Sequence, residues 1–139
     1  MAIYGIGASY EKQKVDMSEK FVSKELACIG HTYEDAPSLH KLLGQIKIGD
    51  LIYIKSWPKN VGLTIKAVGI VIDNEIKDYN IGTGLKVKYI WKGREVIGQL
   101  KEDPYNVRRN TLYEEFNPDI QKKVIQLLLA PNYLKIKRK

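Results

Sequence analysis

The segment IKIGDLIYIKSW, residues 46–57, decides which fold the sequence favours. Gly49 and Asp50 are a turn signal, and apolar side chains begin to alternate directly after them. The segment therefore predicts a strand in which Ile52 and Ile54 face the interior of a small barrel. The strand ends in a cation, a hydroxyl and an indole, which a barrel wall does not need: Lys55, Ser56 and Trp57.

The residues that follow keep the two-residue period of this strand. A Pro/Asn/Gly cluster, PKNVG, predicts a hairpin loop at 58–62, and KGRE predicts another turn at 92–95. A buried first strand is predicted from AIYGIGASY near the start of the chain. The expected strands are 2–10, 50–57, 63–73, 85–93, 96–100 and 111–116. Trp91, in the fourth of them, is expected in the core.

Helical spacing appears in three places. MSEKFVSKELACIG, residues 17–30, predicts a helix that Ser18 caps, that Gly30 ends and that buries Cys28. A second, short helix is predicted at 36–45, with Pro37 in its first turn.

The third helix begins after the last strand. Asn117 is its predicted N-cap, Pro118 its first residue, and Pro131 its end. Its expected buried face is Ile120, Val124, Leu127 and Leu128. We expect one domain over residues 1–131, followed by a basic tail at 132–139.

The order of these elements indicates an α+β protein. One strand, two short helices, four or five antiparallel strands and a C-terminal helix favour a small, bent, mostly antiparallel β pseudo-barrel. This pattern is consistent with a PUA-like pseudo-barrel and equally with an SH3-like barrel that carries insertions.

Composition narrows the function classes. The chain has 139 residues, one cysteine and two histidines, so neither a disulfide framework, a metal site nor a cofactor is expected. The net charge is +7, and without the four basic residues of the last five it would be +3. This excess favours a polyanionic partner, nucleic acid first, although lysine-rich surfaces also simply keep proteins soluble.

The sequence predicts no membrane attachment. No apolar run approaches the ~20 residues of a membrane span. The first residues lack the basic and apolar blocks of a signal peptide. We therefore expect a cytoplasmic protein.

Several motifs together resemble a known family. They are GASY at 7–10, Phe21 early in the first helix, IGDLIYIKS at 48–56, IKAVGIV at 65–71, Val87 with Trp91, and RRNTLYE at 108–114. This combination resembles the N-terminal recognition modules of McrBC-type restriction ATPases, which belong to the PUA-like superfamily with EVE and ASCH domains. The chain departs from the family in ELACIGHTY, where an aromatic usually follows the helix, and we expect no attached ATPase or nuclease.

The resemblance implies an EVE-like pseudo-barrel with a concavity for a nucleobase. A bound base needs a face to stack on, hydrogen bonds to its edge, and cations for its phosphates. Trp57, Ser56 and Lys55 would supply these in turn. The structural alternative is that Trp57 and Pro58 plug the barrel end while Lys55 extends to water.

Further candidates have the same two interpretations. Ser9 and Tyr10 reach this rim if the first strand lies beside the strand of residues 50–57. His31, Tyr33 and Asp35 lie in a loop where a pocket lid would sit, or in an ordinary solvated loop. Arg108 and Arg109 suit phosphate, and equally suit ion pairs with Glu114 or Glu115.

No catalytic constellation is recognisable, so an enzyme is not expected. The sequence favours a non-enzymatic module that holds a nucleobase, as a modified or flipped base in DNA or RNA or as a free nucleotide. The alternative is a phage-encoded anti-defence protein that acts in the host cell. It would sequester a nucleotide signal, or block a host defence complex by protein–protein contact. The oligomeric state stays open.

Overall fold

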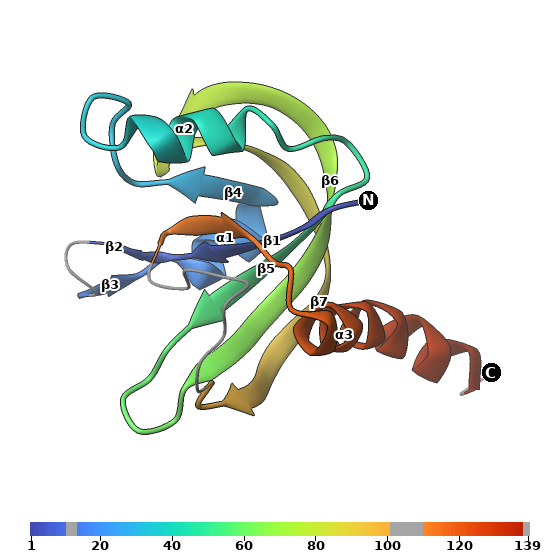
Figure 1. Ribbon diagram of the computed structural model, residues 1–139. Coiled ribbons are helices and arrows are strands. Elements are labelled where there is room, and N and C mark those ends of the chain that lie inside the picture. The colour runs from blue at the N-terminus through green and yellow to red at the C-terminus, as the bar shows by residue number, and fades with distance from the viewer. Residues whose placement is uncertain (11–13, 101–109, 138–139) are drawn as a thin grey trace.

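The computed structural model describes residues 1–10, 14–100 and 110–137, with side chains described as far as residue 130. Within these residues, three helices and eight strands follow one another, and six of the strands form one curled sheet (Figure 1). Their order is β1 Ile3–Gly7, β2 Ser9–Tyr10, β3 Val15–Asp16, α1 Ser18–Lys24, β4 Leu26–Ile29, α2 Pro37–Leu43, β5 Leu51–Ser56, β6 Leu63–Tyr79, β7 Gly82–Gly98, β8 Leu112–Glu114 and α3 Pro118–Lys137.

The large sheet has the strand order β4-β7-β6-β5-β1-β8, and β2 pairs with β3 in a separate ribbon. All pairings are antiparallel except that of β1 with β5, which is parallel. The predicted α+β class and the mostly antiparallel curled sheet are therefore confirmed. Because β1 runs parallel to β5, the C-terminal ends of these two strands lie side by side at the same end of the sheet.

Alternation along the strands divides the core between the two faces of this sheet. In β5, Ile52 and Ile54 belong to one buried cluster, together with Phe21 of α1. Leu51 and Tyr53 belong to a second cluster, which Ile120 and Val124 of α3 complete. The sheet is thus covered on both faces, by α1 and its neighbours on one and by α3 on the other (Figure 1).

The first predicted helix is too long. α1 stops at Lys24 because Glu25 adopts a left-handed conformation (φ 56°), and Leu26–Ile29 then form strand β4. Cys28 is therefore buried in a strand, not in a helix, and Gly30 does not end α1. The approach of β4 to β7 requires Gly84, since a Cβ there would collide with the carbonyl oxygen of Ala27.

The predicted cap of this helix is also wrong. Met17 occupies the N-cap position, and the Ser18 backbone N–H donates to Oδ1 of Asp16 (2.9 Å). The carboxylate two residues upstream thus accepts from the first N–H group of the helix, and no side-chain cap hydrogen bond is present at this end.

The predicted turn at 92–95 does not exist. β7 continues through these residues to Gly98, and a register shift in its pairing with β6, between Ile65 and Ala67, accommodates Gly93. Trp91 pairs with Val68 and packs against the second cluster. It is only half-buried, so the prediction that it belongs to the core is wrong.

The predicted second and third helices are largely confirmed. α2 has Pro37 in its first turn. In α3, Oδ1 of Asn117 accepts hydrogen bonds from the backbone N–H groups of Asp119 (2.9 Å) and Ile120 (3.3 Å). The expected buried face is present, with Leu128 half-buried. The helix does not end at Pro131, however, but continues to Lys137.

In the parts of the chain that the structure describes, no helix combines the length and the apolar character that crossing a membrane requires.

Candidate functional site

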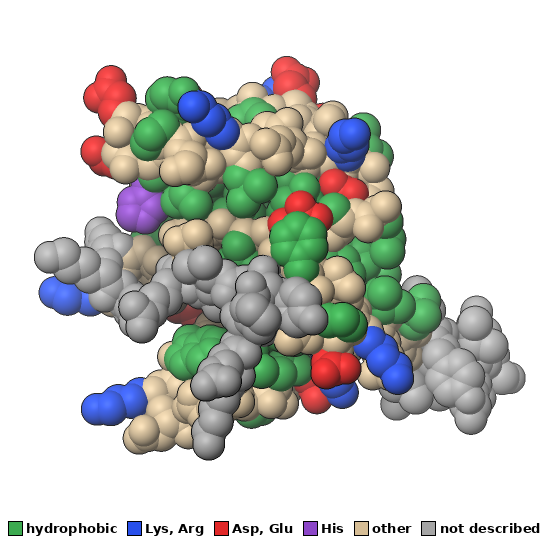
Figure 2. All heavy atoms as spheres, in the orientation of Figure 1, with side chains coloured by type: hydrophobic (Ala, Val, Ile, Leu, Met, Phe, Trp, Pro, Cys, Tyr) green, Lys and Arg blue, Asp and Glu red, His purple; other side chains and the backbone are tan. Residues whose placement is uncertain are grey.

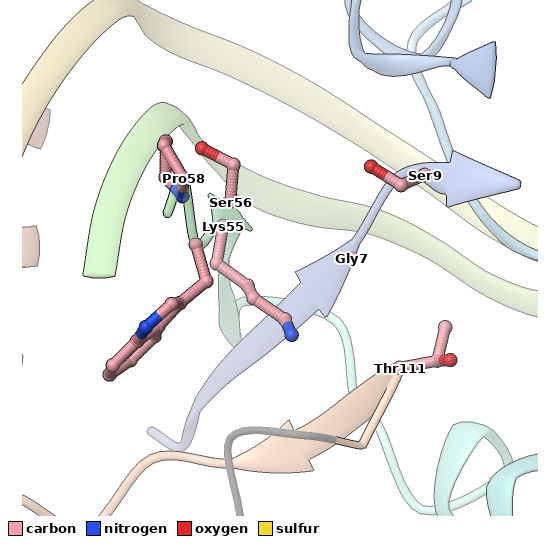
Figure 3. Close-up of a pocket in the computed structure, with 7 residues that line it drawn as sticks. Gly7, Ser9, Lys55, Ser56, Pro58 and Thr111 are labelled. Carbon is pink, nitrogen blue, oxygen red and sulfur yellow. The ribbon is translucent and has the colours of Figure 1, made fainter. Parts of the chain in front are cut away.

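A recess of about 270 Å³ opens where the parallel strands β1 and β5 end (Figure 3). Gly7 and Lys55 are register partners at this point, and the β8 end of the sheet joins through the hydrogen bond from the Gly7 N–H to the carbonyl of Thr111 (2.7 Å). Segments from three distant parts of the sequence therefore form one wall. The described lining residues are Gly7, Ser9, Lys55, Ser56, Trp57, Pro58 and Thr111.

The end of β5 differs from its beginning in burial. Residues 51–54 are buried, Lys55 and Ser56 are half-buried, and Trp57 is 42% exposed. The pairing of β5 with β6 shifts register between Ile54 and Lys55. β5 thus leaves the interior of the protein at its C-terminal end, and the side chains of Lys55 and Ser56 line the recess there.

The Lys55 side chain crosses this recess (Figure 3). It passes over Gly7, where a Cβ would lie 3.4 Å from its Cε, and its Nζ lies 5.9 Å from the centre of the Tyr113 ring. Burial lowers the pKa of Lys55, because desolvation disfavours the ammonium form. An anionic ligand would offset that effect, since a nearby negative charge favours the ammonium.

A buried polar chain lies behind the Tyr113 ring. The Tyr53 hydroxyl donates to Oε1 of Glu115 (2.5 Å) and lies 2.7 Å from the Tyr113 hydroxyl. The other carboxylate oxygen of Glu115 accepts from the Asn117 N–H (3.1 Å). Desolvation, followed by the charge and hydrogen bonds of its two partners, raises the pKa of Tyr53 well above its usual value.

Four sequence-predicted residues meet at this recess: Ser9, Lys55, Ser56 and Trp57. The condition set for Ser9, that the first strand lie beside the strand of residues 50–57, is fulfilled by the pairing of β1 with β5. The structure thus places these four side chains around one opening, and their roles in binding stay predictions.

Tyr10 is directed elsewhere. Its hydroxyl donates to the carbonyl of Ile81 (2.6 Å), and its ring packs edge-on against Phe21. Burial raises the pKa of this hydroxyl. Tyr10 therefore joins β2 to the turn between β6 and β7, and it does not line the recess.

The predicted lid residues form a separate local structure. His40 Nε2 donates to the carbonyl of His31 (2.7 Å), and the ring of Tyr33 packs edge-on against that of His40. The Asp35 N–H donates to Oγ1 of Thr32 (3.2 Å). His31, Tyr33 and Asp35 are exposed and are not lining residues of the recess.

Two predicted phosphate ligands, Arg108 and Arg109, lie outside the described residues. Three lining residues had not been proposed as ligands: Gly7, Pro58 and Thr111. Gly7 and Pro58 lie close in sequence to the predicted ligands Ser9 and Trp57, so the sequence could have predicted their place at the recess. It could not have predicted that of Thr111, because only the pairing of β8 with β1 brings it there.

No protein-family model matches this chain, and neither does any curated protein sequence.

Proposed function

We propose that the protein is a non-enzymatic binding module that holds a nucleobase-bearing ligand in the recess at the ends of β1 and β5. The observation that carries the proposal is the meeting of an ammonium, hydroxyls and an exposed indole around one opening. These are the groups that a nucleotide requires: a cation for phosphate, hydrogen-bonding groups for the base edge, and an aromatic face for stacking.

The proposed roles follow from exposure and chemistry. Trp57 has 42% of its surface exposed, so a base can stack on it without unfolding the barrel. Ser56 and Ser9 can each donate and accept one hydrogen bond at the base edge. Lys55 is the cation among the described lining residues.

A PUA-like, EVE-like fold is part of the same proposal. It is supported by the curled, mostly antiparallel sheet, by the two short helices between β1 and β5, and by α3 after the last strand. The motif resemblance adds the expectation that such a domain accommodates a base beside the barrel.

The size of the recess favours one small ligand. Pockets for drug-sized molecules usually measure about 300–1,000 Å³, and this recess is just below that range. On the face drawn in Figure 2, the basic side chains of the described residues stand apart from one another and form no continuous track. A mononucleotide, or a single base of a polymer, therefore fits these features better than a long stretch of backbone.

Titration calorimetry with two sets of ligands tests the proposal. One set is the four common nucleoside monophosphates, and the other is single-stranded and double-stranded oligonucleotides with and without modified bases. We expect saturable binding of one base type that Trp57→Ala weakens. If no nucleotide and no oligonucleotide binds at millimolar concentration, the proposed function is wrong.

A further inference from the structure

We propose that the recess contains a phosphate subsite centred on the Lys55 ammonium, and that Tyr113 is the residue that positions this ammonium. The inference rests on the proposed function, because it concerns the same recess. It adds the ligand class, a nucleoside that carries a phosphate monoester, and a positioning residue that does not line the opening.

The first support is the path of the Lys55 side chain. Its aliphatic part runs over the Cα of Gly7, and its Nζ reaches the face of the Tyr113 ring, 5.9 Å from the ring centre. A cation at this distance is attracted by the electron-rich face of an aromatic ring. The ammonium is therefore held at the sheet end of the recess.

The second support is the direction of the buried hydrogen bonds. Tyr53 has one hydroxyl proton, and it donates this proton to Glu115 (2.5 Å). In the 2.7 Å pair of hydroxyls, Tyr113 must then be the donor and Tyr53 the acceptor. A phenol that donates toward a carboxylate gains electron density in its ring, which strengthens the attraction for an ammonium over its face.

The third support is that the Tyr113 ring cannot move toward the sheet. Tyr113 is the register partner of Gly5, and a Cβ at Gly5 would collide with Cζ of the ring. The ring thus lies directly on the glycine backbone, packs edge-on against Tyr53, and is 4% exposed. Its position is fixed by packing below and by the hydroxyl chain at its end.

The fourth support is the set of hydroxyl groups that line the recess together with Lys55. Hydroxyls from three separate segments line the same opening: Ser9, Ser56 and Thr111. A phosphate monoester has several acceptor oxygens, and an ammonium and a hydroxyl are both hydrogen-bond donors. A hydroxyl that does not contact the base edge can therefore donate to a phosphate beside Lys55.

Calorimetry on matched ligands measures the phosphate contribution. The ligands are the four nucleoside monophosphates, their parent nucleosides, and inorganic phosphate. We expect a monophosphate to bind at least about tenfold tighter than its nucleoside, as one charge-assisted hydrogen bond implies. Single-stranded oligonucleotides with and without a 5′-phosphate distinguish a free mononucleotide from a strand end as the source of the same group.

Variants assign this contribution to residues. Lys55→Met is expected to abolish the difference between monophosphate and nucleoside. Lys59→Met, an exposed lysine four residues away that does not line the recess, is expected to leave it unchanged. Unchanged phosphate dependence in Lys55→Met overturns the subsite.

Two substitutions test the positioning role. Tyr113→Phe keeps the ring and its packing but removes the hydroxyl chain, and we expect a roughly threefold loss for the monophosphate alone. Tyr113→Leu removes the ring, and we expect most of the phosphate contribution to be lost. The Kd of the nucleoside, which a merely structural change would also raise, is expected to stay constant in both variants. If neither substitution changes the ratio of the two Kd values, Tyr113 does not position Lys55.

The outcomes separate this inference from the proposed function. Equal binding of nucleoside and monophosphate to the wild-type protein overturns the phosphate subsite and leaves nucleobase binding standing. Binding of inorganic phosphate that requires Lys55, without any nucleoside binding, supports the subsite and overturns nucleobase binding. Absence of binding by all three ligand types overturns both.

Discussion

Lys55, near the end of strand β5, is half-buried, whereas Trp57, just beyond that end, is exposed. Residues 51–54 of the same segment are buried between two cores, and only the last three side chains reach the recess or its rim. Polar groups that emerge from a rigid strand are held more precisely than groups on a loop. The contacts and charges of these side chains can therefore be tested one residue at a time.

Trp57→Ala is expected to weaken binding of the preferred nucleotide by about 1–3 kcal/mol, the contribution of one base–aromatic stack. The indole is 42% exposed, so its removal leaves the core intact and the melting temperature nearly unchanged. Calorimetric titration and a thermal melt measure the two effects. The matched control is Tyr33→Ala, an aromatic that is 56% exposed and away from the recess. A nucleotide affinity that survives the loss of the indole would remove Trp57 from the site.

Asp16 predicts a dependence of stability on pH. Burial alone would raise the pKa of this carboxyl, but hydrogen bonds from Lys66 Nζ (2.5 Å) and from Ser18 lower it to about 2. The charged form therefore stabilises the fold above the unfolded pKa near 4, and this contribution is lost as the pH falls from about 4 to 2. The carboxylate is more than half exposed, so the contribution is below about 1 kcal/mol.

Urea denaturation of the wild type and of Asp16→Asn at several pH values measures this contribution. The substituted amide keeps an acceptor for the Ser18 N–H but loses the charge. The difference in free energy of unfolding is expected to be largest at pH 6–7 and to vanish near pH 2. A difference that is the same at both ends of this range would assign the effect to packing and not to charge.

Among the secondary-structure elements, capping residues predicted the start of α3 correctly, whereas hydrophobic periodicity misplaced the end of α1. Asn117 and Pro118 predicted the start of α3 because the cap depends on residues adjacent in sequence. The end of α1 was missed because Leu26 and its neighbours are apolar enough for either a helix or a strand. Pairing with β7 made them a strand. The predicted turn in β7 failed for the same reason, since β6 pairs on both sides of Gly93.

Loss of the Asn117 cap is expected to destabilise the protein. Asn117→Ala leaves the N–H groups of Asp119 and Ile120 without their acceptor, which costs about 1 kcal/mol. Chemical denaturation measures the change in the free energy of unfolding. Asn117→Ser keeps a capping oxygen and is expected to recover most of the loss, whereas equal destabilisation by both substitutions would show that the amide acts through other contacts.

The whole molecule places one curled sheet between two hydrophobic layers. Both faces of the sheet are covered at β5, whose polar side chains lie at its end, and the recess opens there. Net charge is a property of the whole molecule. The excess of +7 attracts any polyanion without selecting a base.

Deletion of residues 135–139 tests this separation of charge from selectivity. The truncation removes four positive charges, so the slope of log affinity for an oligonucleotide against log salt concentration should become shallower. Affinity for a mononucleotide and preference among bases should not change. Fluorescence titrations at several salt concentrations measure both quantities. A change in base preference in the truncated protein would place part of the site in the tail.

The sequence by itself determined the α+β class, the hairpin after β5, the start of α3, and the polar end of β5. Each of these depends on residues close together in the chain, through turn chemistry, capping or alternation. The tertiary structure decided that Leu26–Ile29 form a strand and that β1 runs parallel to β5. It also brought Thr111 to the recess and buried Tyr53, Tyr113 and Glu115 behind Lys55. These features depend on hydrogen bonds and packing between distant segments, whose partners no local pattern specifies.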